Sequence, residues 1–252
     1  MALETLLRED GETIAYLRTR GKQHQTVWLG GFKSDMSGTK AEALDSWAAR
    51  RGRAFLRFDY YGHGKSSGLF RNGTISRWRE DALAVLDRLC EGPQILVGSS
   101  MGAWIALLAA QLRPERVDGL LLIAPAPDFT EALMWARMSP EIRRQIIEQG
   151  EWLRPPAYED GPYPITRELI EDGRRNLILG GAIAVQCPVH IVQGMEDPDV
   201  PWQHAMRLVE RLPGSPVLTL IKKGDHRLST PADLARIEHA LDGLLAEITA
   251  QA

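Results

Sequence analysis

The chain has 252 residues, of which 44% are hydrophobic and 25% are charged, and its formal net charge is −3. This length allows one large domain or two small ones, and the composition is ordinary for a globular enzyme. The nearly balanced charge gives no reason to expect a nucleic acid or an anionic membrane as a partner, so we predict neither.

The first ten residues carry acidic side chains and no apolar core segment, which argues against a signal or transit peptide. Further along the chain, no apolar stretch reaches the length of a membrane span. Two cysteines, Cys90 and Cys187, lie far apart in the sequence and fit a reducing compartment. We therefore expect a cytoplasmic protein without a membrane span.

Short apolar strands alternate with helical patterns along most of the chain. Residues 12–18 alternate between apolar and polar side chains, which predicts an exposed, antiparallel strand at a sheet edge. The later strands are expected at residues 26–29, 54–58, 94–97, 119–124, 189–192 and 217–221, and the helices at 41–51, 75–89, 103–112, 203–212 and 232–248. This alternation predicts the α/β class, with a mostly parallel sheet flanked by helices on both faces.

Residues 126–186 break the alternation. They contain no convincing strand, only helical fragments near residues 129–138, 140–149 and 166–177, joined by a loop rich in proline and tyrosine. An insertion of this length in a compact domain is usually functional or disordered. Its aromatic and soft side chains argue against disorder, namely Trp135, Met138, Trp152, Tyr158 and Tyr163.

We interpret this insertion as a small helical cap over the strand ends, the alternative being an inert extra helical layer. The expected domains are then residues 1–125 and 187–252 as two parts of one core, with residues 126–186 as the cap. From the cap, we expect Trp135, Met138, Trp152 and Tyr163 to contact the substrate.

A nucleophile-elbow pattern, G-x-S-x-G, lies at Gly98-Ser99-Ser100-Met101-Gly102. An apolar strand leads into it and an apolar helix follows, which is the setting that this pattern requires. The elbow would hold the Ser100 hydroxyl at the end of a sheet strand, beside the N–H groups of a helix N-terminus. The alternative is a tight strand-to-helix turn with an idle serine.

A serine hydroxyl needs a positioned base. Among the six histidines, His226 follows the last predicted strand, and loops after parallel strands gather at the sheet edge that carries the elbow. His190, His204 and His239 lie within predicted strands or helices and are expected to be packed or solvated. The imidazole needs a carboxylate partner, and Asp197 is our choice, with Asp199 second and Glu196 third.

The oxyanion formed by the attack needs preorganised N–H donors. One is expected from Met101, the residue after the nucleophile, and one from Phe32 in the loop Gly30-Gly31-Phe32-Lys33. Gly31 is also expected to border the substrate. The neighbouring loop, residues 59–66, matches no phosphate-binding fingerprint and is interpreted as structural, with His63 as a weak candidate for substrate contact.

These segments together resemble the α/β-hydrolase superfamily, and the resemblance covers nearly the whole chain. A narrower resemblance is to the mitochondrial acyl-glucuronide esterase and protein depalmitoylase group with its bacterial relatives. It depends on residues 31–41 (GFKSDMSGTKA) and 98–104 (GSSMGAW). The resemblance implies Ser100 as nucleophile, Asp197 as acid, His226 as base, and Phe32 and Met101 as oxyanion donors. Because no transit peptide is evident, a mitochondrial location is not carried over.

The prediction is a serine hydrolase that cleaves a small-molecule carboxylic ester or thioester through an acyl-enzyme on Ser100, without a metal or an organic cofactor. Basic cap residues could bind an anionic part such as a glucuronide or CoA, or could form a solvated face: Arg137, Arg143, Arg144 and Arg154. Two alternatives stay open, a receptor-like ligand-binding protein with little turnover and an acyltransferase. We expect a monomer or a homodimer.

Overall fold

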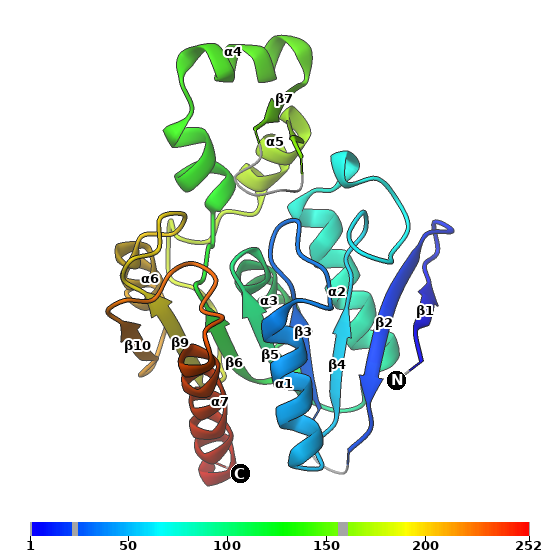
Figure 1. The fold of residues 1–252 in the computed structure, drawn as a ribbon, viewed down its shortest axis with the longest axis vertical. Helices are drawn as coiled ribbons and strands as arrows, with labels where there is room; N and C mark the ends of the chain where they lie inside the picture. The colour runs from blue at the N-terminus through cyan, green and yellow to red at the C-terminus, as the bar shows by residue number, and fades with distance from the viewer. Residues whose placement is uncertain (1, 22–24, 156–160, 252) are drawn as a thin grey trace.

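The core of the computed structural model is one eight-stranded sheet with strand order β1-β2-β4-β3-β5-β6-β9-β10 (Figure 1). The structure describes residues 2–21, 25–155 and 161–251. The strands are β1 (Glu4–Leu7), β2 (Thr13–Thr19), β3 (Thr26–Leu29), β4 (Phe55–Phe58), β5 (Gln94–Ser99), β6 (Val117–Ile123), β9 (Val189–Gly194) and β10 (Val217–Ile221). The pairs β1–β2 and β2–β4 are antiparallel, and the pairs from β4 to β10 are parallel.

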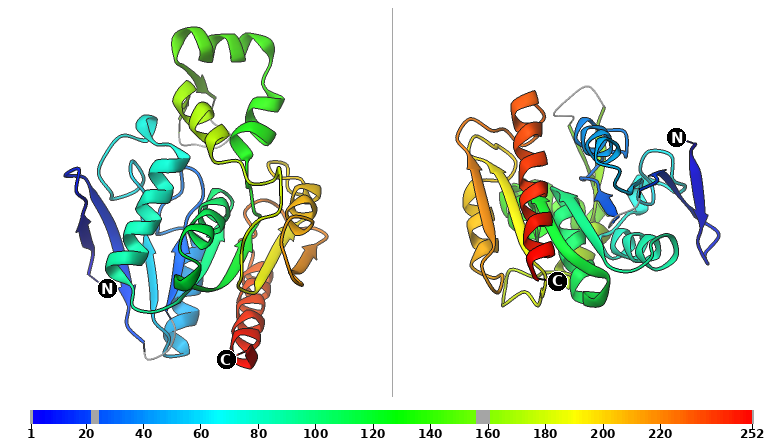
Figure 2. Two further views of the ribbon diagram at one scale, coloured as in Figure 1. Left: turned by 180° about the vertical axis from the view of Figure 1, so that it is seen from behind. Right: turned by 90° about the horizontal axis from the view of Figure 1, so that it is seen from below.

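Helices cover both faces of this sheet, as predicted (Figure 2). On one face lie α1 (Thr39–Arg50) and α7 (Pro231–Gln251), and on the other α2 (Ile75–Leu89), α3 (Met101–Leu112) and α6 (Trp202–Val209). Successive strand residues point to opposite faces, so Ile95 and Val97 pack with α1 and α7 while Leu96 packs with α2 and α3. Two short 3₁₀ turns complete this part, η1 (Phe70–Asn72) and η2 (Pro114–Arg116).

Between β6 and β9 the chain rises into a separate layer above the carboxyl ends of the strands (Figure 1). It contains the helical turns η3 (Thr130–Met134) and η4 (Trp135–Arg137), the helices α4 (Pro140–Gln149) and α5 (Arg167–Arg175), and the strands β7 (Glu151–Arg154) and β8 (Tyr163–Thr166). Ser139 and Thr166 cap α4 and α5 by accepting hydrogen bonds from backbone N–H groups. We call residues 130–175 the cap; the domain boundaries at residues 126 and 186 stay predictions.

The antiparallel pair β7–β8 corrects the expectation that this insertion has no strand. Each strand is only four residues long, and its partner lies beyond the proline-rich loop. A ladder that short leaves no alternation pattern distinguishable from a loop. The pairing places Trp152 beside Ile165, at the centre of the cap. Among the described residues, no helix combines the length and apolar character needed to cross a membrane.

Candidate active site

Ser100 lies in a backbone conformation that few residues adopt. Its φ of 56° and ψ of −116° turn the chain sharply between β5 and α3. Neighbouring glycines make this turn possible, because a Cβ on Gly102 would lie 2.0 Å from the carbonyl oxygen of Leu29. The Ser100 N–H donates to the Ile123 carbonyl at 2.9 Å, which ties the turn to β6. Strain held by its surroundings in this way is typical of functional sites.

A chain of two hydrogen bonds connects Ser100 to a buried carboxylate. The Ser100 Oγ lies 3.1 Å from His226 Nε2, and His226 Nδ1 lies 2.7 Å from Asp197 Oδ2. His226 comes from the loop after β10 and Asp197 from the loop after β9, so both reach the carboxyl edge of the sheet. These distances are within the reach that general-base catalysis requires. The structure thus brings together three side chains that are distant in the sequence.

Asp197 is held from several directions. Its Oδ1 accepts from the N–H groups of Asp199 at 2.9 Å and Val200 at 2.8 Å, and Gln193 Nε2 donates to its Oδ2 at 3.2 Å. Of the three carboxylates considered from the sequence, Asp197 is the one bonded to His226. Asp199 instead lines the neighbouring cleft. The backbone N–H of Glu196 donates to the Gly224 carbonyl, which joins the loop after β9 to the loop after β10.

The other described histidines lie elsewhere. His190 pairs with Glu247 at 3.0 Å, His204 contacts the Pro127 carbonyl at 2.7 Å, and His239 is exposed on α7. Burial lowers the pKa of His204. His63, a weak candidate for substrate contact, is buried and is not among the cleft-lining residues. His24 lies outside the described residues.

The two predicted oxyanion donors flank Ser100. A Cβ on Gly31 would lie 3.5 Å from the Cβ of Ser100, so the loop after β3 packs directly against the serine. Phe32 and Met101 both line the cleft, and Met101 is the first residue of α3, where backbone N–H groups point outward.

A cleft of about 350 Å³ opens beside Ser100, between the sheet edge and the cap. Its apolar wall comes from the loop after β3 (residues 30–33, the oxyanion loop), the start of α3, the segment after β6, the cap and the loop after β9: Phe32, Met101, Ala126, Phe129, Leu133, Met134, Tyr163 and Val200. Five of these, Ala126, Phe129, Leu133, Met134 and Val200, were not predicted. The signal that could have found them is their position in the segments that follow β6 and β9, two strands that also end at this edge.

The predicted substrate contacts divide into two groups. Gly31 and Tyr163 line the cleft. Trp135, Met138 and Trp152 do not, because they pack around the buried isoleucines Ile146, Ile165 and Ile170 inside the cap. A small layer separated from the main core needs its own apolar centre, and these large side chains supply it. Tyr158 lies outside the described residues.

Basic side chains border the cleft. We call them the basic rim: Lys33, Lys40, Arg137, Arg154 and Arg227. Arg137 donates to the Asp199 backbone carbonyl, and the Lys33 ammonium lies 4.4 Å from the centroid of the Tyr163 ring. Lys40 donates to the Arg227 carbonyl, and burial lowers its pKa to about 8. Of the predicted basic residues, Arg143 and Arg144 do not line the cleft; Arg143 binds backbone carbonyls of η4.

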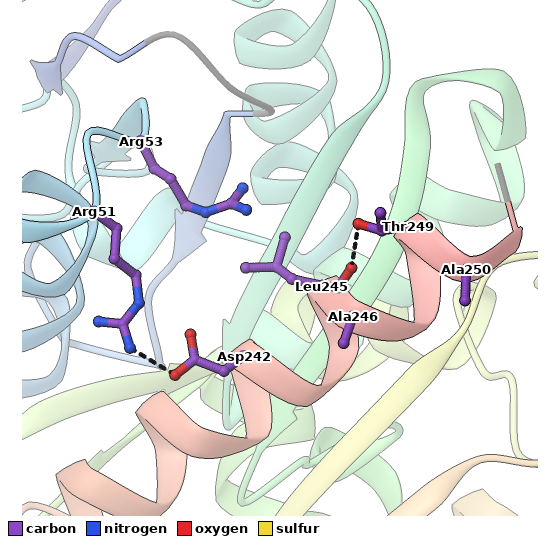
Figure 3. A pocket seen from close by; sticks show the side chains of 7 residues that line it. All are labelled: Arg51, Arg53, Asp242, Leu245, Ala246, Thr249 and Ala250. Carbon is purple, nitrogen blue, oxygen red and sulfur yellow. Dashed lines mark hydrogen bonds and ion pairs between the residues drawn. The ribbon is translucent and has the colours of Figure 1, made fainter.

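A second hollow, of about 650 Å³, lies between the end of α1 and the carboxyl-terminal part of α7 (Figure 3). These helix ends lie at the opposite end of the molecule from the cap (Figure 1). Arg51 pairs there with Asp242 at 2.7 Å, and Thr249 donates to the Leu245 carbonyl at 2.8 Å. None of its lining residues belongs to the Ser100 cleft.

Comparison with known proteins gives consistent matches along the chain. The model of the alpha/beta hydrolase family matches residues 27–237. The mouse (Mus musculus) protein named palmitoyl-protein thioesterase ABHD10, mitochondrial, is 36% identical over 250 residues, which cover 98% of this chain and 84% of that protein.

Two solved structures agree with this result. A protein of Agrobacterium vitis S4, described only as a hydrolase, is 47% identical, with a TM-score of 0.91 over 97% of this chain and 99% of that one. Mouse alpha/beta hydrolase domain-containing protein 10 is 37% identical, with a TM-score of 0.91 over 98% of this chain and all of that one. The resemblance and the fold class predicted from the sequence are thereby confirmed.

The predicted cytoplasmic location is wrong by the same comparison. Five relatives that match 98% of this chain, from five mammals, are all named as mitochondrial proteins. The prediction depended on composition, cysteine content and the acidic character of residues 1–10. These properties describe a folded enzyme and do not determine the compartment that receives it.

Proposed function

Because this chain belongs to the alpha/beta hydrolase family, we propose that it is a serine hydrolase that cleaves carboxylic esters or thioesters through an acyl-enzyme on Ser100. The observation that carries the proposal is the hydrogen-bonded chain from Asp197 through His226 to Ser100. These hydrogen bonds end at Ser100, which borders a cleft with an apolar wall. An idle serine in a tight turn would have no need of a bonded imidazole and a buried carboxylate behind it.

In the proposed mechanism, His226 Nε2 takes the Ser100 proton while Oγ attacks the acyl carbonyl. Asp197 holds Nδ1–H, which sets the tautomer and stabilises the imidazolium that forms. The tetrahedral intermediate collapses, and His226 gives its proton to the leaving alcohol or thiol. Water then attacks the acyl-enzyme by the same route in reverse, which releases the acid and restores Ser100.

The N–H groups of Phe32 and Met101 are the proposed donors to the oxyanion. One comes from the loop packed against the serine and the other from the first turn of α3. A donor of this kind is typically worth roughly 100- to 1,000-fold in turnover.

The proposed substrates are acyl thioesters or esters with an apolar acyl group. The named relatives are palmitoyl-protein thioesterases, and the apolar cleft wall suits an acyl chain. The basic rim favours substrates that also carry negative charge, such as a glucuronide or CoA, because it gives the cleft of an acidic protein a locally positive potential. The oligomeric state, a monomer or a homodimer, stays a prediction.

The test compares wild type with Ser100→Ala on p-nitrophenyl esters and acyl-CoA thioesters, together with labelling by a fluorophosphonate probe. We expect turnover to fall by about 10⁴-fold or more and labelling to disappear in the variant. Ser215→Ala, which changes an exposed serine of the loop before β10, is the matched control and should keep both. Equal turnover in wild type and Ser100→Ala would refute the proposal. A wild type that is labelled but turns over no acyl substrate would favour the receptor-like alternative.

A further inference from the structure

His63 is a buried imidazole with no place in the proposed relay. It lies in the loop after β4, and only 4% of its surface is exposed. Its Nε2 lies 3.2 Å from the backbone nitrogen of Lys33, and its Nδ1 lies 3.1 Å from the Tyr61 carbonyl oxygen.

One protonation state satisfies both contacts. The Lys33 N–H is a donor, so Nε2 must accept, and Nδ1 must then carry the proton that it donates to Tyr61. Burial lowers the pKa of His63 to about 4, so the neutral form is present at ordinary pH. Nε2 is therefore available as an acceptor for the Lys33 N–H across the range in which hydrolases are assayed.

The turn held by His63 is the one that presents the Phe32 N–H. The Ser34 N–H donates to the Gly31 carbonyl at 3.1 Å, which closes a turn over residues 31–34. Lys33 occupies the left-handed region there, with a φ of 61°. A residue with a side chain is strained in that region, so the surroundings must hold it. The hydrogen bond to His63 fixes the direction of the peptide group between Phe32 and Lys33.

The His63 ring shares its packing partners with the Phe32 ring. Phe70 lies 5.2 Å from the His63 ring and 5.0 Å from the Phe32 ring, and Trp78 lies 5.3 Å and 5.8 Å from them. The Trp78 Nε1–H also donates to the Tyr61 carbonyl, beside the His63 contact. Phe70 of η1 and Trp78 of α2 therefore contact both the Phe32 ring and the His63 ring, and His63 in turn bonds to the Lys33 N–H. The backbone and the side chain of the oxyanion loop are thus held by the same aromatic cluster.

We propose that His63 is a positioning residue for the oxyanion hole. Its Nε2 accepts the Lys33 N–H and thereby holds the turn that aims the Phe32 N–H at the oxygen of the tetrahedral intermediate. This inference rests on the proposed function, since it concerns the same reaction at Ser100. Loss of the acceptor leaves the substrate-binding surface in place and weakens only the transition-state contact.

The experiment compares three replacements with the wild type. His63→Phe keeps an aromatic ring in the cluster and removes the acceptor, His63→Gln keeps an acceptor at a similar reach, and His190→Phe is the matched control. His190 is another buried histidine, bonded to Glu247 on α7 and remote from the oxyanion loop. The measurements are kcat and KM on a p-nitrophenyl ester, inhibition by an alkylboronic acid that forms a tetrahedral adduct with Ser100, and Tm.

In His63→Phe we expect kcat to fall by about 10- to 100-fold, part of what a whole oxyanion donor is worth. KM should stay within about threefold, and boronate affinity should fall in step with kcat, because only the tetrahedral species uses the misplaced donor. His63→Gln should recover most of kcat. His190→Phe should lower Tm without changing kcat.

Unchanged kcat in His63→Phe would overturn the inference, as would equal losses in the Phe and Gln variants. If His63→Phe does not fold, His63→Met replaces it as the variant without an oxygen or nitrogen acceptor and is compared with His63→Gln by the same criteria. The Ser100→Ala result separates the two proposals. Inactive Ser100→Ala with wild-type kcat in His63→Phe refutes only the role of His63, whereas active Ser100→Ala refutes the proposed function itself.

Discussion

Asp197 and Asp199 are two residues apart, yet the structure gives their carboxylates different surroundings. Asp197 is buried and accepts hydrogen bonds from two backbone N–H groups and a glutamine amide, besides contacting His226. Asp199 borders the cleft and is exposed. A carboxylate that must orient an imidazole through every step needs the first environment, because fixed donors hold its oxygens in place.

This difference predicts unequal effects of two matched substitutions. Asp197→Asn should lower kcat by about 10⁴-fold, since an amide favours the wrong histidine tautomer. Asp199→Asn should change kcat by less than about tenfold, as expected for a cleft-wall group outside the relay. The measurement is kcat on a p-nitrophenyl ester, with circular dichroism to verify folding. A larger loss in Asp199→Asn would assign the acid role to Asp199.

At the scale of elements, the cap divides its side chains between the cleft and its own centre. Leu133 on η3 lines the cleft, Trp135 on η4 and Trp152 on β7 pack around the cap isoleucines, and Met134 on η3 does both. Neighbouring residues on a helical turn point in different directions, so one short segment serves both surfaces. The cap therefore contributes to the acyl-binding wall through η3 and to its own stability through β7.

Leu133→Trp should narrow the apolar part of the cleft and shift preference toward shorter acyl chains. Each methylene excluded from such a pocket is worth about 1–3 kcal/mol, so we expect the ratio of kcat/KM for octanoyl and acetyl p-nitrophenyl esters to fall by about tenfold or more. Trp152→Phe is the control from the cap centre, and it should lower Tm with the ratio unchanged. An unchanged ratio in Leu133→Trp would show that acyl chains bind elsewhere.

For the molecule as a whole, the Asp128 carboxylate joins the two segments through which the polypeptide passes between the core and the cap. The Asp128 side chain accepts from the backbone N–H groups of Ile178 at 2.9 Å and Leu179 at 2.9 Å. Asp128 is on the segment that leaves β6, and its partners are on the segment that returns after α5. Farther out, the Asp172 carboxylate accepts from the Ser76 N–H, which ties the cap to α2.

We expect Asp128→Ala to loosen the cap while leaving the sheet intact. Amide hydrogen exchange in residues 130–175 should accelerate by about tenfold or more, with little change in β5 and β6, because sub-global opening follows local contacts. Asp128 has a φ of 58°, so alanine also adds backbone strain. Asp128→Asn tolerates that conformation and keeps one acceptor, and it should give an intermediate effect. Equal acceleration in sheet and cap would mean that they open as one unit.

Several features of the fold could be predicted from residues alone, and the misses have a shared cause. The buried strands β5, β6 and β9 were predicted because short apolar runs at this spacing favour a parallel sheet. The strand β1 and the pair β7–β8 were missed because they are short and largely exposed or half-buried, so they lack the apolar run by which the equally short but buried β3 and β4 were predicted. The compartment was wrongly predicted because no residue of the folded core encodes it.

Local patterns in the sequence were enough to predict the α/β architecture, the elbow at Ser100 and the loops that bring His226 and Asp197 to the same edge. These follow from local patterns combined with one topological rule, that the carboxyl ends of parallel strands gather together. The contacts of the folded chain were needed to show which carboxylate bonds to His226, which cap side chains reach the cleft, and that His63 Nε2 accepts the Lys33 N–H. Each of these is a contact between residues far apart in the chain, and its partner is chosen by packing that no local pattern records.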